Sequence, residues 1–284
     1  MKILLWLRII RPQTLFASLV PVLVGLIIAS SSQPSGTFEL NALTAVITVI
    51  CALSLQILSN LINDYYDFIR GSDKAGRAGF KRALAEGEVS VEQMRRACFI
   101  TLAVALITGL YLVIEGGWPI LLAGVTAIIF AWLYTATSHS LSYLGIADIF
   151  VFLYYGVIAS CGTTYLQTHT FCLTSFHAGA VCGLISMCVL MINNLRDIES
   201  DRAAGKRTLP VRLGKHGAET VMAFEVLLMP LFAYLAFGFS IPMLIGPAAI
   251  ILFFAVLKAK GAQYNKCLLC TGLMNALYYI LIIL

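Results

Sequence analysis

Long apolar segments recur along the whole chain, and they constrain its fold more than any other feature of the sequence. A run of about 20 apolar residues is long enough to cross the hydrocarbon core of a bilayer as a helix. Such runs fall near residues 13–31, 40–62, 97–114, 117–135, 144–167, 171–193, 219–238, 240–257 and 267–284. We therefore predict an all-α membrane protein with about nine transmembrane helices in one bundle, and a single transmembrane domain that spans residues 1–284.

The composition excludes the soluble classes of protein. Of the 284 residues, 60% are hydrophobic and only 12% are charged, whereas a soluble domain carries about 25% charged residues. So few charges do not cover the surface of a soluble body of this size. Soluble enzymes and nucleic-acid-binding proteins are excluded, and no nucleic-acid partner is expected.

The basic residues are confined to one side of the predicted bundle. Lys and Arg total 19, and with nine spans all of them fall in residues 1–12 or in the connections 63–96, 194–218 and 258–266. All of these segments lie on the N-terminal side, and cytoplasmic loops of membrane proteins carry an excess of Lys and Arg. We therefore expect a multi-pass protein of the cell inner membrane with a cytoplasmic N-terminus and a cytoplasmic-side active site.

Two segments on this side carry the same kind of polar pattern, in which one Asn and two Asp follow an apolar span at helical spacing. They are Asn60, Asp64 and Asp67 after the second span, and Asn194, Asp197 and Asp201 after the sixth. Side chains at these spacings share one helix face. Mg²⁺ typically takes one or two carboxylates together with phosphate oxygens and water. The pattern favours two Mg²⁺ sites that grip a diphosphate between them; the alternative is two solvated helix ends.

The paired motifs resemble those of the UbiA superfamily of intramembrane prenyltransferases, in which an NxxxDxxD-type motif follows the second of nine helices and a DxxxD motif follows the sixth. Within the superfamily, the chain is most similar to the branch that prenylates 1,4-dihydroxy-2-naphthoate. The similar stretches are residues 11–25, 63–73, 143–156 and 193–214. The position of Asp73 and the absence of a Lys-Arg pair after Tyr134 favour this branch over the 4-hydroxybenzoate branch.

The resemblance implies an enzyme that moves a polyprenyl group from polyprenyl diphosphate to 1,4-dihydroxy-2-naphthoate, with loss of the ring carboxylate, to give demethylmenaquinol. It implies Mg²⁺ as cofactor and membrane lipid as surroundings. The implied metal ligands are Asp64, Asp67, Asp197 and Asp201, with Asn60 and Asn194 completing or orienting the two sites. The candidate phosphate-binding residues are Arg11, Arg82, Arg196 and Lys206.

Several other polar residues lie in or beside the apolar segments. Asp148 interrupts an apolar run, and an intramembrane carboxylate is costly and usually functional. It is a candidate to orient the acceptor hydroxyl or take its proton, and the alternative is a residue that starts a helix. Tyr134 and Tyr143 are candidates to place π faces near an allylic cation, although most tyrosines of such a protein serve packing. Glu225, alone in its span, is more simply explained as structural.

Two alternatives remain open at this level. One is another aromatic prenyltransferase of the same superfamily, with 4-hydroxybenzoate or homogentisate as acceptor. The other is a non-enzymatic lipid-diphosphate transporter. A secondary transporter is expected to place its ion site near the membrane midplane, whereas the acidic residues here gather at one side. The distribution of charge therefore favours the enzyme.

Overall fold

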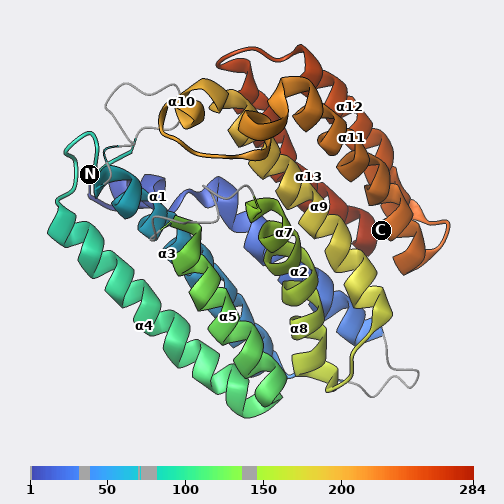
Figure 1. The fold of residues 1–284 in the computed structure, drawn as a ribbon. Helices are drawn as coiled ribbons and strands as arrows, with labels where there is room; N and C mark the ends of the chain where they lie inside the picture. The colour runs from blue at the N-terminus through green and yellow to red at the C-terminus, as the bar shows by residue number, and fades with distance from the viewer. Residues whose placement is uncertain (1, 32–38, 70, 72–81, 136–145) are drawn as a thin grey trace.

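The structure is a computed structural model that describes residues 2–31, 39–69, 71, 82–135 and 146–284. Every regular element in these ranges is helical (Figure 1). The α-helices are α1 (Lys2–Ile10), α2 (Pro12–Ser31), α3 (Ala42–Ile69), α4 (Val91–Gly116), α5 (Trp118–Thr135), α7 (Ala147–Phe152), α8 (Ile158–Thr168), α9 (Leu173–Arg196), α10 (Ile198–Ala203), α11 (Leu209–Phe237), α12 (Ile245–Lys258) and α13 (Gln263–Ile283). A π-helical turn, η1 (Leu153–Val157), joins α7 to α8, and a 3₁₀ turn, η2 (Ile241–Leu244), precedes α12.

The described helices include eight that are long enough and apolar enough to cross a membrane. A ninth apolar segment, Trp118–Phe130 within α5, is shorter than the usual span. All nine coincide with apolar runs expected from the sequence, so the all-helical membrane fold is confirmed. The exact number of crossings stays a prediction.

Helix α9 lies at the centre of the bundle (Figure 1). It packs against α2, α7, α8, α11 and α13, and 72% of its apolar span is buried inside the protein. Its side chains Ile185, Met191 and Ile192 are fully enclosed. A helix that is apolar on all sides is suited to such a central position, because every face meets another helix.

A close backbone contact sets the position of α7 against α9. A Cβ at Gly183 would lie 2.6 Å from the backbone oxygen of Phe152, and one at Gly156 would overlap the backbone of Gly179. The glycines therefore let the two backbones approach more closely than residues with side chains allow. They meet where the single π-helical turn interrupts the span Ala147–Thr168.

The helices extend beyond the apolar runs at the end of the bundle where α1 and α10 lie (Figure 1). Helix α3 continues to Ile69 rather than ending near residue 62. Segment α11 begins at Leu209 rather than near 219, and it is kinked at Gly214, whose φ of 72° and ψ of 173° are not helical. Apolar composition marks the part of a helix inside the hydrocarbon, whereas hydrogen bonding carries the helix on until a break or cap. The polar motif of α3 therefore lies on a continuous helix.

Candidate active site

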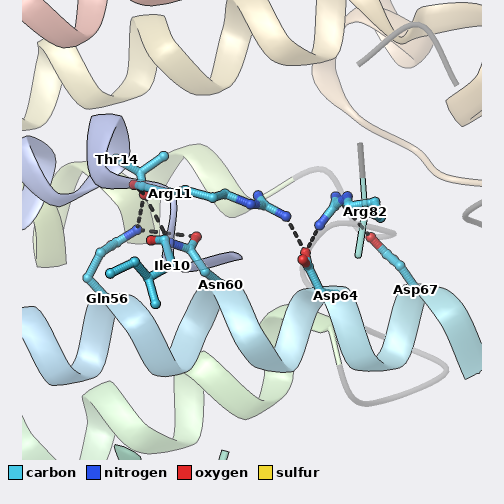
Figure 2. A network of polar contacts seen from close by, with 8 residues as sticks. All are labelled: Ile10, Arg11, Thr14, Gln56, Asn60, Asp64, Asp67 and Arg82. Carbon is cyan, nitrogen blue, oxygen red and sulfur yellow. Dashed lines mark hydrogen bonds and ion pairs between the residues drawn. The ribbon is translucent and has the colours of Figure 1, made fainter. Parts of the chain in front are cut away.

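The first acidic motif lies on the last turns of α3, and the prediction that its residues share one helix face is confirmed (Figure 2). Asn60, Asp64 and Asp67 are 7%, 3% and 3% exposed, so this polar face points into the protein and not into solvent. Buried carboxylates need compensating partners, because burial of an unpaired charge is costly. The partners come from two segments distant in sequence.

Two arginines supply those partners. The guanidinium groups of Arg11 and Arg82 both form ion pairs with Asp64 Oδ1, and Arg82 Nη2 lies 3.7 Å from Asp67 Oδ2 (Figure 2). Arg11 occupies the break between α1 and α2 with a positive φ of 54°, a conformation that is uncommon for residues other than glycine. The break directs its side chain across the motif face of α3. Both arginines thus lie beside the first acidic motif, and their phosphate-binding role stays a prediction.

Asn60 serves a second purpose that the sequence did not indicate. Its Nδ2 donates to the backbone oxygen of Ile10 at 3.1 Å and to Thr14 Oγ1 at 2.9 Å (Figure 2). Gln56 Nε2 donates to Asn60 Oδ1 at 3.4 Å and to Thr14 Oγ1 at 3.3 Å. These bonds tie the break that carries Arg11 to α3. The sequence does not predict the role of Gln56 and Thr14, because a lone polar residue in an apolar run forms no spacing pattern.

The second acidic motif lies at the junction of α9 and α10. Arg196 binds Asp197 with two parallel hydrogen bonds, Nε to Oδ1 at 2.9 Å and Nη2 to Oδ2 at 2.8 Å. Its Nη1 donates to Asn265 Oδ1 at 2.9 Å, which attaches the motif to the start of α13. Lys206 Nζ lies 3.6 Å from Asp201 Oδ1, and Asp201 is buried. Asn194 is half-buried in the last turn of α9.

The helix on which this motif was expected is interrupted. Asp197 has φ −100° and ψ 12°, so α9 ends at Arg196 and α10 begins at Ile198. The Asp201 amide still donates to the Asp197 backbone oxygen at 2.8 Å, which keeps the two aspartates one turn apart. Asp is a poor helix former because its side chain competes for local hydrogen bonds. Here it is engaged by the neighbouring Arg196.

The two acidic pairs lie at the same end of the bundle, where α1, α10 and the end of α3 are found (Figure 1). They remain separate pairs: within the described part of the chain, no three Asp, Glu, His or Cys side chains gather into a group suited to hold a metal ion. Each pair instead has its own basic partners. The arrangement consists of two carboxylate pairs, each already balanced by cations of the protein.

The remaining predicted residues divide into those the structure places and those it leaves undescribed. Asp148 lies in the first turn of α7, is 5% exposed, and has an Oδ1 atom without a hydrogen-bond partner among the described residues. Tyr134 belongs to the last turn of α5, and its side chain is not among those described. Tyr143 and Asp73 lie outside the described residues. All eight cysteines are free thiols.

The amino-acid sequence is similar to that of a known protein family and of several named relatives. The sequence model described as the UbiA prenyltransferase family matches residues 18–276. A 1,4-dihydroxy-2-naphthoate octaprenyltransferase of Escherichia coli is 39% identical over 75% of this chain and 70% of its own length. A protein of the same name from Haemophilus influenzae is 32% identical over 84% of this chain and 78% of its own.

A solved structure shares the fold. It is that of a UbiA homologue from Archaeoglobus fulgidus bound to DMAPP and Mg²⁺, with a TM-score of 0.71 and 20% sequence identity, covering 97% of this chain and 96% of that one. At this identity the similarity establishes the arrangement of helices. The bound metal and prenyl diphosphate are properties of that homologue.

Proposed function

The chain belongs to the UbiA prenyltransferase family, and we propose that it transfers a polyprenyl group from polyprenyl diphosphate to 1,4-dihydroxy-2-naphthoate. The ring loses its carboxylate, and the product is demethylmenaquinol. The names of the two relatives support this choice of acceptor. The observation that carries the proposal is the two carboxylate pairs with basic partners at one end of an apolar bundle, in which Asp64, Asp67 and Asp201 are buried.

We propose that Mg²⁺ is the cofactor, and the residues present fit it. Asp64 and Asp67 form one pair of carboxylates, Asp197 and Asp201 the other, and a hard cation prefers such oxygen ligands. Asn60 and Asn194 lie in the same two segments and would complete or orient the sites. When bound, Mg²⁺ neutralises the negative charge that develops on the leaving diphosphate. Two carboxylates in each site leave room for phosphate oxygens among the ligands.

The basic residues bind the diphosphate in this proposal. Arg11, Arg82, Arg196 and Lys206 are the groups that now balance the aspartates. With Mg²⁺ and substrate bound, the four aspartates would hold the metal, and the guanidinium and ammonium groups would be available to bind phosphate oxygens. Arginine is suited to this exchange because its planar fork donates two parallel hydrogen bonds to a phosphate as readily as to a carboxylate.

The transfer itself leaves charge and atoms balanced. The C–O bond of the prenyl diphosphate breaks, and its electron pair leaves with the diphosphate. The electron-rich ring forms the new C–C bond with the allylic cation, and the ring carboxylate departs as carbon dioxide, so no net proton is consumed. Asp148 accepts a hydrogen bond from an acceptor hydroxyl and so orients the ring. Tyr134 and Tyr143 are proposed to shield the cation, within an apolar bundle that excludes water.

We propose further that residues 1–284 act as one transmembrane prenyltransferase domain in the cell inner membrane. The N-terminus and the acidic clusters are placed on the cytoplasmic side, because the connections at that end carry the Lys and Arg residues. That side also supplies Mg²⁺ and the anionic acceptor. Membrane lipid surrounds the helices.

The proposal is tested with purified protein supplied with a polyprenyl diphosphate and 1,4-dihydroxy-2-naphthoate, with Mg²⁺ or with EDTA. We expect diphosphate release and a prenylated naphthoquinol only with Mg²⁺, and loss of both in Asp64→Ala and Asp197→Ala. Product formed without metal, or full activity in both variants, contradicts the mechanism. Replacing the acceptor by 4-hydroxybenzoate or homogentisate tests its identity, and absence of any prenylated product favours a lipid-diphosphate transporter.

A further inference from the structure

Glu225 carries a carboxyl group inside the bundle, and the proposed reaction gives this residue no role. It lies in the middle of α11, is 3% exposed, and shares the buried face of that helix with Met222 and Met229. Cys188 of α9 donates its Sγ–H to Glu225 Oε2 at 3.3 Å. The other oxygen, Oε1, is buried without a hydrogen-bond partner among the described residues. A polar atom left in this state usually has a ligand, ion or water as its partner.

Asp148 lies near this group. Helices α7 and α9 run antiparallel, and the backbone of Phe152 meets Gly183. One helical turn further along both helices, Asp148 comes level with residue 187, beside Cys188. The carboxyl groups of Asp148 and Glu225 interact electrostatically. Two acidic side chains from α7 and α11 therefore approach the same part of α9, and each has one buried oxygen without a partner among the described residues.

The two groups differ in the charge that they can carry. Two carboxylates close together in an apolar interior repel, so both do not stay ionised. Glu225 is the better candidate to hold a proton, because its neighbours on the buried face of α11 are the methionine side chains Met222 and Met229, which do not solvate a charge. A protonated Glu225 is a hydrogen-bond donor at Oε1, and an ionised Asp148 is an acceptor at Oδ1.

We propose that Asp148 and Glu225 together bind the oxygen substituents of the aromatic acceptor, Asp148 accepting from a hydroxyl group and protonated Glu225 donating to a second oxygen. This inference rests on the proposed function and extends it to a residue of α11. A hydroxynaphthoate carries both a hydroxyl donor and anionic or phenolic oxygens, so it matches one acceptor and one neutral donor. A second ionised carboxyl would instead repel the acceptor's own carboxylate.

The test compares Glu225→Gln, which keeps a neutral hydrogen-bond donor, with Glu225→Leu, which removes it. Glu219→Leu is the matched control, because it removes a carboxyl from the same helix near its ion partners Lys215 and His216. Binding of 1,4-dihydroxy-2-naphthoate to the purified full chain is measured without prenyl diphosphate. The KM values for both substrates are then measured with Mg²⁺.

We expect Glu225→Leu to weaken acceptor binding about tenfold, the usual effect of losing one buried hydrogen bond. The KM for polyprenyl diphosphate stays unchanged, and Glu225→Gln restores acceptor binding. The inference is overturned if Glu225→Leu binds the acceptor like the wild type, if it weakens both substrates equally, or if Glu225→Gln is as defective as Glu225→Leu. If the wild-type protein forms no prenylated naphthoquinol, that result contradicts the proposed function instead. The binding measurement still tests whether Glu225 contacts the acceptor.

Discussion

Asn60 of the first acidic motif also holds the surrounding fold together. Its two donor bonds fasten the break between α1 and α2, and thereby Arg11, to α3. We expect Asn60→Ala to lower the free energy of unfolding by about 1–3 kcal/mol, because buried partners lose their donors. Thermal unfolding in detergent measures this, with the half-buried Asn194→Ala as comparison. An unchanged melting temperature in Asn60→Ala would show that these bonds contribute nothing.

In the proposed mechanism, Arg82 competes with Mg²⁺ for the same carboxylates. Its guanidinium contacts both Asp64 and Asp67, so Mg²⁺ must displace it to bind there. We expect Arg82→Gln to be less stable than wild type in EDTA, since removing one partner leaves buried charge behind. Added Mg²⁺ should then raise its melting temperature more than that of the wild type.

Arg202→Gln is the control for this measurement, because Arg202 pairs with Glu199 on the exposed side of α10 at 3.1 Å. Exposed ion pairs contribute little to stability, so its response to Mg²⁺ should equal that of the wild type. Equal Mg²⁺ responses in Arg82→Gln and wild type would mean that the metal does not bind at Asp64 and Asp67.

At this scale the sequence predicts the kinds of residue at the site but not their partners. The spacing of Asn60, Asp64 and Asp67 is a local property, so the shared face follows from helical periodicity alone. The pairing of Asp64 with Arg11 and Arg82 joins segments more than 15 residues distant, and depends on how three elements pack. The contact between Cys188 and Glu225 is of the same kind. No pattern within one helix encodes it.

At the scale of elements, hydrophobicity places the helices and glycines adjust their contacts. The apolar runs locate every described span, but the π-helical turn Leu153–Val157 and the interruption at Asp197 have no such signal. The π-helical turn coincides with the close packing of Phe152 and Gly156 against α9, and the composition of the sequence does not reveal this packing. Single π-helical turns are frequent at functional sites, and this one directly follows α7, the helix that carries Asp148.

Gly183 tests the importance of this contact. A Cβ there would meet the backbone oxygen of Phe152 at 2.6 Å, and a backbone atom cannot turn aside. We expect Gly183→Ala to lose about 1–3 kcal/mol of stability. Gly124→Ala, where a Cβ meets nothing within 4 Å, should be neutral or stabilising by up to about 1 kcal/mol. Thermal unfolding of both variants decides the matter, and equal melting temperatures would show that α7 moves freely away from α9.

At the scale of the whole molecule, the placement of charge predicts the site more directly than any single motif does. The predicted even number of spans between the two motifs puts the ends of α3 and α9 at one end of the bundle, and Figure 1 shows both helix ends there. The separation between the two acidic pairs does not follow from such counting. It depends on the tilt of each helix, which is set by packing with its neighbours.

The Lys and Arg residues of the connections also predict which side of the membrane each end of the bundle faces. Ser240 lies just before the span that contains α12, and Ala262 lies just after it; both residues are exposed. The connection at Ala262 lies next to the Arg196–Asn265 contact. We expect a membrane-impermeant maleimide to label Ala262→Cys only from the cytoplasmic side and Ser240→Cys only from the opposite side, because the basic connections remain inside. Vesicles of both orientations measure this, with the wild-type chain and its eight free thiols as the background. Reversed labelling would place the acidic clusters outside the cytoplasm, and labelling of both variants from one side would contradict the crossing of α12.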